Sequence, residues 1–295
     1  MSNRAEAPER VRWPIVGAGV ALAAVFTVAT LILADPAPPL RNPAANPADS
    51  LVGAWTAAAG GRAVFDSLQA VSFTVTRIGY DTLTGRASGV ESHDVWIRWR
   101  AGVPAVRIDH AAGSTAVMGF DGRSAWALVN RARVPDGSPL QQEAVRATQE
   151  VLRWLDVPYT LSDSSVVMTY RGTLRRSDIP LLRDDGRSSV QPEHAEFHSV
   201  TVERSAPVGV PSEFTYYFNL GDRFPSDVTY TDRGRVVREV MGSVERAGST
   251  SLAYVARRDL FVGSGSRLET VLIADFDVDP HVSGLAFDAP GDDGS

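Results

Sequence analysis

The most enzyme-like string in the sequence is HAEFH, at residues 194–198, because histidine and glutamate side chains bind metals that activate water. On a strand all three side chains share one face, but the backbones of His194 and His198 then lie ~13 Å apart, too far to share one ion. On a helix the histidines align while Glu196 points elsewhere, and the zincin pattern places its glutamate directly after the first histidine. Because a strand-like VTV run follows at 200–202, we interpret the string as a strand entry, with a metal-dependent hydrolase as the lesser alternative.

A second string, DFDVDPH at residues 275–281, alternates aspartates like the start of a calcium-binding loop. Pro280 stands where that loop needs glycine, and Ala286 stands where it needs a bidentate glutamate. We therefore interpret the aspartates as the solvated face of a strand. The opposite face of that strand then carries Leu272, Ala274, Phe276 and Val278.

The segment 171–189 gathers five arginines, but three aspartates interleave with them and neutralise most of the charge. We interpret it as a solvated hairpin loop, with a lipid-headgroup or partner site as the alternative. The run Ile179-Pro180-Leu181-Leu182 is unusually apolar for a loop tip. It is suited to dipping into a membrane, to docking a partner or to folding back on the sheet.

Missing residue types exclude several kinds of chemistry. The chain has no lysine and no cysteine, which removes Schiff-base and P-loop lysines, thiolate nucleophiles and disulfides. No G-x-S-x-G string occurs, and the glycines at 262–267 lack the third glycine of a dinucleotide loop. We therefore expect no enzymatic activity, no metal and no cofactor. The net charge of −6 also argues against a nucleic-acid partner.

Residues 14–34 form an uncharged apolar segment, and as a helix they would span ~30 Å, the thickness of a bilayer core. Three arginines precede the segment in residues 1–13, so we expect that part to stay in the cytoplasm. We predict a single-pass inner-membrane anchor, with a cleaved signal peptide as the alternative. The proline-rich residues 35–48 then form a spacer, residues 49–290 one periplasmic domain, and residues 291–295 a disordered tail.

Two segments of that domain have helical spacing. Asp49 is suited to cap a helix that Gly60-Gly61 ends, and a second short turn follows through Leu68. Ser138 and Pro139 open a longer helix with a capping box. Its apolar face carries Leu140, Ala144, Thr148, Val151, Leu152 and Leu155, while Gln142, Glu143, Arg146, Gln149, Glu150 and Arg153 are expected to face water.

About eleven other stretches alternate with a period of two and end in turn residues such as Asp121-Gly122. They predict a mainly β fold with a few helices (α+β), in which a curled antiparallel sheet forms an unclosed barrel with helices over its concave face. We expect Arg98, Arg100, Asp227, Thr229 and Glu239 on the outer face. The side chains expected on the concave side are Phe73, Val75, Ile97, Trp99, Met118, Phe120, Trp126, Leu128, Val151, Leu155, Val200, Phe214, Tyr216 and Phe218.

The order of these elements resembles the LolA/LolB-like family of periplasmic carriers and sorting proteins for outer-membrane lipoproteins. The likeness lies in the broken helix ending at Gly60-Gly61, in FDGRSAW at 120–126, in the helix running into Val157-Pro158-Tyr159, and in FTYYFNLGDRFPSDVTY at 214–230. It implies an unclosed barrel whose concave cavity, lined by the fourteen residues above, shelters acyl chains. An ordinary packed core is the alternative interpretation of the same residues.

The resemblance implies a non-enzymatic envelope protein whose partners are lipid or lipoprotein acyl chains, with an inner-membrane protein as a further candidate partner. The predicted membrane anchor departs from the soluble or lipidated carriers of that family, since a tethered protein does not easily cross the periplasm. The alternative is therefore a membrane-anchored sensor or interaction module that has the same fold and carries no cargo.

Overall fold

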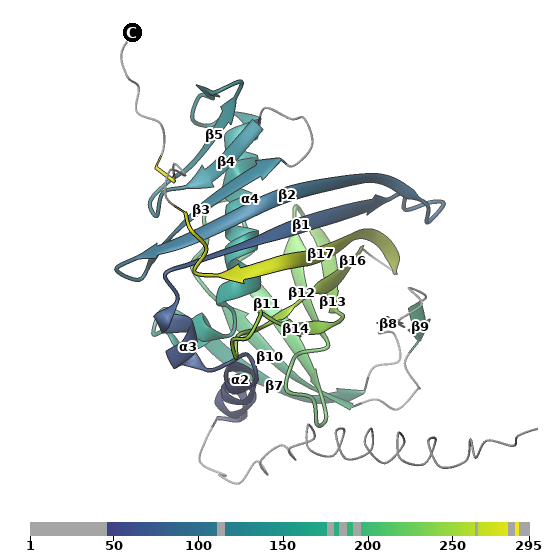
Figure 1. Cartoon of the computed structure of the whole chain (residues 1–295). Helices are drawn as coiled ribbons and strands as arrows, with labels where there is room; N and C mark the ends of the chain where they lie inside the picture. The colour runs from purple at the N-terminus through teal and green to yellow at the C-terminus, as the bar shows by residue number, and fades with distance from the viewer. Residues whose placement is uncertain are drawn as a thin grey trace, which may run out of the picture. The chain divides into compact units, whose positions relative to one another are not determined.

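The computed structural model describes residues 46–110, 116–175, 180–182, 188–190, 196–262, 265–282 and 287–288. The described chain is mainly β, as the sequence predicts, with a sheet of 13 strands and three α-helices (Figure 1). The helices are α2 (Pro47–Ala58), α3 (Arg62–Ser67) and α4 (Pro139–Asp156), and the 3-10 helix η1 (Tyr159–Ser162) follows α4.

Every pair of neighbouring strands in the large sheet is antiparallel. Hairpins join the first six strands in chain order. These strands are β1 (Ala70–Tyr80), β2 (Ala87–Arg100), β3 (Val103–His110), β4 (Ala116–Phe120), β5 (Ala125–Val129) and β6 (Ala132–Arg133). The other seven are β7 (Val167–Arg175), β10 (Glu196–Glu203), β11 (Glu213–Asn219), β12 (Asp227–Asp232), β13 (Arg235–Met241), β16 (Arg257–Val262) and β17 (Ser266–Val278).

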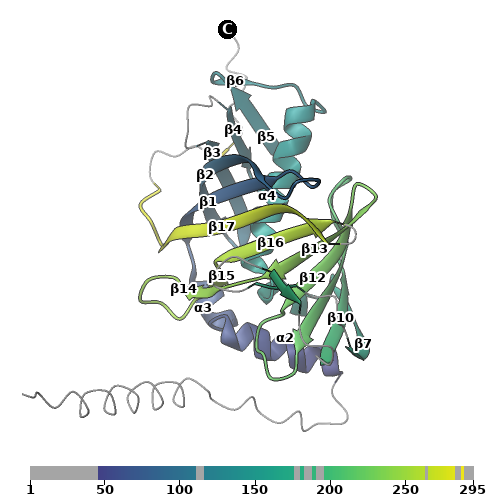
Figure 2. The ribbon, with the colours of Figure 1, turned by 90° about the vertical axis from the view of Figure 1, so that its right-hand side faces the viewer.

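The last strand, β17, joins the two halves of the sheet because it pairs with β1 on one side and β16 on the other. The order across the sheet runs from β6 through β1, β17 and β16 to β7, as Figure 2 shows from one side. Within the described residues β6 and β7 each have one neighbour, so the sheet is not closed. Two small hairpins stand apart from it, β8 (Pro180–Leu182) with β9 (Ser188–Val190) and β14 (Val244–Arg246) with β15 (Ala253–Val255).

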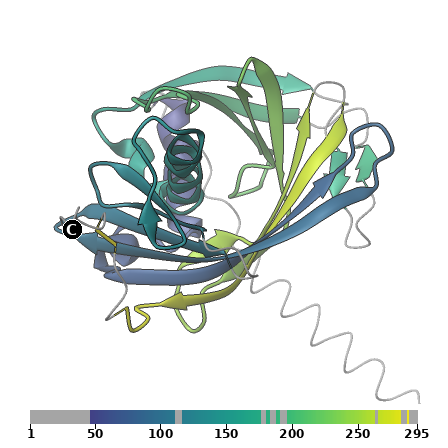
Figure 3. The same cartoon turned by 90° about the horizontal axis from the view of Figure 1, so that it is seen from above.

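The sheet curves around α4, which lies along its inner face (Figure 3). The core of this half contains Val71, Val95 and Val106 of the strands together with Val151 and Leu155 of α4. A second cluster lies between α2 and strands β10 to β12, where Trp55 contacts the rings of Tyr216 and Phe218. The helices therefore cover the concave face, as predicted.

The predicted boundaries of α2 are partly right. Gly60 and Gly61, with φ of 114° and 86°, end the helix as expected, because an L side chain rarely adopts those angles. The cap, however, is Asn46 and not Asp49, since the Asn46 side chain accepts a hydrogen bond from the Ala48 backbone N–H at 3.1 Å. Pro47 stands at the first helical position, where its missing N–H has no cost.

A bulge in β17 changes which side chains face inward. The prediction that Leu272 and Ala274 point to the core is wrong, because Val271 and Ile273 are buried there instead. Asp275 has a φ of 52°, and the pairing with β1 shifts at this point. After the bulge, Phe276 and Val278 pack against the core, as expected.

Several predicted features lie outside the described residues. They are the apolar segment 14–34, most of the spacer 35–48, Ile179, His194 and the tail 291–295. Among the helices that the structure describes, none is both long and apolar enough to cross a bilayer.

Candidate ligand-binding cavities

The helix α4 positions the inner side chains on which a binding site would depend. Ser138 caps it as predicted, with its side-chain oxygen accepting a hydrogen bond from the Gln141 backbone N–H at 3.3 Å. The apolar face of α4 packs against β3, β4 and β5. Small side chains at Ala125 and Ala127 of β5 are buried in this contact, which lets the helix approach the sheet closely.

The prediction that the charged face of α4 faces water holds for Gln142 and Glu143 near its start but is wrong towards its end, where the curved sheet covers the helix. Arg153 is only 6% exposed, and its Nη2 lies 2.6 Å from a carboxylate oxygen of Glu239 on β13. Glu150 likewise pairs with Arg77 of β1. Glu239, which we expected on the outer face, points inward and is fully buried. The polar face of α4 thus lies opposite a second wall of the same sheet.

Two cavities flank α4 between these walls. Cavity A, of about 320 Å³, has a floor made by Val75, Val95, Ile108 and Met118 of the sheet together with Ala147 and Val151 of α4. Its rim is polar. The rim consists of Arg77, Glu91, His93, His110, Glu143 and Glu269.

Two histidines on neighbouring strands form part of the rim of cavity A. His93 and His110 pair across β2 and β3, and their ring centroids lie 4.4 Å apart. Burial lowers the pKa of His93, and the nearby His110 and Arg77 lower it further, so this ring is neutral at pH 7. Its Nδ1 is buried and has no hydrogen-bond partner in the described part of the chain.

Cavity B, of about 270 Å³, lies against the charged face of α4. One wall comes from that face and presents Glu143, Arg146, Gln149, Glu150 and Arg153. The opposite wall has an apolar part, beside which Arg204, Asp232, Arg233 and Glu269 also line the cavity. The apolar part is formed by Phe214, Tyr230, Val237, Leu260 and Leu268, with Val210 and Pro211 beside them.

Arg77 lies at the boundary between the two cavities and lines both of them. Its guanidinium pairs with Glu150 of α4 at 2.5 Å and with Glu269 of β17 at 3.1 Å. It also lies over the Trp154 ring, 5.2 Å from its centroid. These contacts connect β1 and β17 to α4 and hold a charged side chain between the two cavities.

A buried ionic cluster closes the space beyond cavity B. Glu239 accepts hydrogen bonds from Arg153 at 2.6 Å and from Arg258 at 2.8 Å. Burial alone would raise the pKa of Glu239, but the two guanidiniums hold it below its ordinary value. The carboxylate is therefore ionised at neutral pH, and the cluster fixes α4 to β13 and β16.

Asp156, at the end of α4, is a buried carboxyl group with weaker compensation. Burial raises its pKa to about 6, although Arg204 and Arg153 act in the opposite direction. Its Oδ1 has no hydrogen-bond partner among the residues described. A group with this pKa changes charge near neutral pH.

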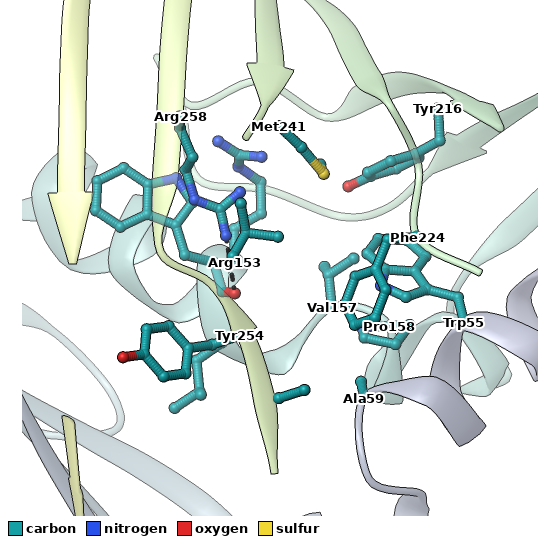
Figure 4. A pocket seen from close by; sticks show the side chains of 14 residues that line it. Trp55, Ala59, Arg153, Val157, Pro158, Tyr216, Phe224, Met241, Tyr254 and Arg258 are labelled. Carbon is teal, nitrogen blue, oxygen red and sulfur yellow. Dashed lines mark hydrogen bonds between the residues drawn. The ribbon is translucent and has the colours of Figure 1, made fainter. Parts of the chain in front are cut away.

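The region around Tyr216 is packed and not open. A void of only about 20 Å³ remains between Trp55, Val157 and Tyr216, which is about the space of one water molecule. Figure 4 shows Arg153 and Arg258 on one side of this void and the hydrogen bond from Arg258 Nη2 to the Trp154 carbonyl oxygen, 3.4 Å long. This end of the concave face therefore has no room for an acyl chain.

Twelve of the fourteen residues predicted to line a concave cavity divide into three groups. Val75, Met118 and Val151 line cavity A, and Phe214 lines cavity B. Leu155 and Tyr216 border only the small void. Six others face the concave side but are taken up by packing, namely Phe73, Ile97, Trp99, Phe120, Val200 and Phe218.

The prediction that Trp126 and Leu128 point into the concave side is wrong. In the register of β4 with β5, Met118 faces Ala127, whereas Trp126 lies opposite Gly119 on the other face. The Trp126 indole N–H donates to the carbonyl oxygen of Phe287 at 3.1 Å, so the ring is buried under the C-terminal segment. The turn before it is as predicted, with Gly122 at a φ of 95°.

The cavities also involve residues that the sequence did not indicate as a site. Arg77, His93 and His110 each lie in a strand with ordinary alternation, and nothing in their spacing shows that the topology brings them together. The buried pairing of Arg153 with Glu239 joins positions 86 residues apart in the chain. Local alternation placed Glu239 on the outer face of its strand, so the sequence held no signal for this pair.

The strings that suggested metal chemistry have structural roles. His198 Nδ1 lies 2.7 Å from the Tyr170 hydroxyl, and Glu196 pairs with Arg175. Asp279 Oδ1 accepts hydrogen bonds from the backbone N–H groups of Gln69 and Ala70. The described residues contain no group of three or more histidine, aspartate or glutamate side chains that could hold a metal ion.

Comparisons with known proteins show similarity in structure alone. No protein-family model matches the sequence, and no curated protein matches it. A solved structure of a DUF1329 family protein from Desulfovibrio piger matches with a TM-score of 0.50 at 10% identity, covering 82% of this chain and 96% of that chain. A LolA superfamily protein from Nitrosomonas europaea matches with a TM-score of 0.49 at 8% identity, covering 79% of this chain and 94% of that chain. At these identities the likeness concerns the fold only, and it agrees with the mainly antiparallel sheet that the structure describes.

Proposed function

We propose that this protein is a non-enzymatic binding protein of the bacterial envelope that holds the acyl chains of a lipid or lipoprotein beside α4. The observation that carries the proposal is cavity A, whose floor consists of six apolar side chains within a volume of about 320 Å³. Binding sites for small apolar ligands have volumes and linings of this kind. Cavity B supplies a second apolar wall on the other side of the helix.

The energy of such binding comes from removing methylene groups from water. Each buried methylene contributes about 0.8 kcal/mol, so six of them contribute about 5 kcal/mol before the cost of ordering the chain. The packed region around Tyr216 leaves no room for an acyl chain at that end of the concave face. The residues proposed to contact the chain are Val75, Met118 and Val151 in cavity A and Phe214 in cavity B.

The proposed location follows from the N-terminal sequence. Residues 14–34 are long and apolar enough to anchor the protein in the inner membrane, and the arginines before them favour a cytoplasmic N-terminus. The domain with the cavities would then lie in the periplasm, close to the membrane that supplies its ligand. Lipoprotein sorting or local lipid transfer are the roles that suit such a placement.

The test is to fill cavity A without adding charge. Ala147→Phe places a ring in the cavity, while Ala57→Phe makes the same change at an exposed position on α2. The whole chain is incubated with a fatty acid that carries a photoreactive diazirine, and labelled residues are mapped by mass spectrometry. We expect labelling near Met118 and Val151 in the unmodified protein. Ala147→Phe should reduce it about tenfold, which corresponds to a loss of about 1.4 kcal/mol in binding free energy, whereas Ala57→Phe should leave it unchanged. Equal labelling of both variants at those residues contradicts the proposal.

A further inference from the structure

The two walls of cavity B differ in chemistry. The α4 wall is charged, whereas the opposite wall combines an apolar part, made by Phe214, Tyr230 and Leu260, with the charged Arg204, Asp232 and Arg233. A purely apolar ligand would leave the charged side chains without hydrogen-bond partners, and water alone would leave the apolar side chains in contact with water. The cavity therefore suits a molecule with one apolar and one polar part.

Two arginines on this cavity lack strong partners. Arg146 Nη1 is buried without a hydrogen bond, and its only ion pair among the described residues is with Glu143, at 3.9 Å. Arg204 makes no ion pair within 4 Å in the part of the chain that the structure describes, although it interacts electrostatically with the buried carboxyl of Asp156. Its guanidinium lies 5.2 Å from the centroid of the Phe214 ring. Both side chains line cavity B.

The acidic groups of cavity B are mostly engaged elsewhere. Glu150 and Glu269 both pair with Arg77. Glu143 lies 3.8 Å from Arg233, a third arginine of the cavity, and is about half exposed. Asp232 is the remaining carboxylate on the wall. Among the lining residues, three guanidiniums, at Arg146, Arg204 and Arg233, thus face the two carboxylates that Arg77 does not hold. Asp156 interacts with Arg204 but does not line the cavity.

From this arrangement we infer that cavity B binds a single-chain amphiphile with an anionic head, a carboxylate or a phosphate, between Arg146 and Arg204. The chain of this ligand lies along Phe214, Tyr230 and Leu260. A guanidinium group donates two parallel hydrogen bonds to a carboxylate or a phosphate, and burial strengthens this interaction. The inference rests on the proposed function, because it names the head group of a ligand whose chain that function already requires.

The experiment compares three diazirine probes of equal chain length, a fatty acid, a fatty alcohol and a fatty amine. The whole chain in an uncharged detergent is labelled with each probe, and the double variant Arg146→Gln/Arg204→Gln is compared with Arg86→Gln in the exposed hairpin between β1 and β2. We expect the acid to label cavity B about tenfold better than the alcohol, and the amine to label it least. The double variant loses this preference, while Arg86→Gln retains it.

Two other outcomes overturn the inference in different ways. If acid, alcohol and amine label cavity B equally in the unmodified protein, the anionic head group is wrong while acyl-chain binding stands. If no probe labels either cavity, the proposed function fails as well. Labelling of the double variant by the alcohol at the unmodified level shows that the variant is folded, so a lost acid preference reports on the head group itself.

Discussion

Single charged residues inside this protein are held by partners that come from distant parts of the chain. Arg153 and Glu239 were both expected in water because each lies on the polar side of its local pattern. Their burial depends on the curvature of the sheet, which brings β13 over the charged face of α4. Local spacing contains no information on that curvature, so the sequence could predict α4 but not its buried ion pairs.

Asp156 allows a test of burial at the scale of one residue. The pKa of its carboxyl group is about 6 in the folded protein, whereas the ordinary pKa of an aspartate is 3.8. Its protonated form is therefore favoured by folding, and this contribution to stability is complete below pH 3.8 and is lost as the pH rises through about 6. Asp156→Asn removes the titration. We expect the variant to gain about 1–3 kcal/mol in free energy of unfolding, relative to the unmodified protein, between pH 4 and pH 7.

The measurement is urea unfolding of both proteins at a series of pH values. Taking the difference between them cancels the titration of other groups, such as His93, whose lowered pKa acts in the opposite direction. A constant difference across this range would show that Asp156 is not buried as described.

At the scale of elements, alternation identifies strands more reliably than it identifies their inner face. The pattern at β5 correctly groups Trp126 with Leu128, but the larger side chains do not face α4. Ala125 and Ala127 face the helix because it lies so close that only small side chains fit. In β17 the pattern fails at Asp275, where the bulge exchanges the two faces. In both cases the deciding contact comes from another element.

The placement of Trp126 against β4 can be tested with a pair of glycine substitutions. A methyl group at Gly119 would lie 2.2 Å from a ring carbon of Trp126, so Gly119→Ala forces this pair of strands apart. We expect a loss of about 1–3 kcal/mol in the free energy of unfolding. Gly89→Ala on β2 is the control, since nothing lies within 4 Å of the added methyl group. Equal effects of the two changes would show that Trp126 lies on the other face.

At the scale of the whole molecule, the open 13-stranded sheet and the single long helix inside it produce both cavities. The order of elements was enough to predict an open antiparallel sheet with helices on its concave face. The positions of the cavities were not predictable, because they depend on where α4 leaves space between its two faces and the curved sheet. Most of the residues predicted on the concave side pack against other side chains in the core, and only a few line a cavity where they could contact a ligand.

The central claim is that these cavities hold acyl chains. The most direct test is native mass spectrometry of the whole chain purified from bacterial membranes, followed by extraction and identification of bound molecules. We predict at least one equivalent of a lipid or acylated peptide per chain, retained after detergent exchange and reduced in Ala147→Phe but not in Ala57→Phe. A folded protein free of any acyl-bearing molecule would contradict the account and would favour a cargo-free sensor that acts through protein partners.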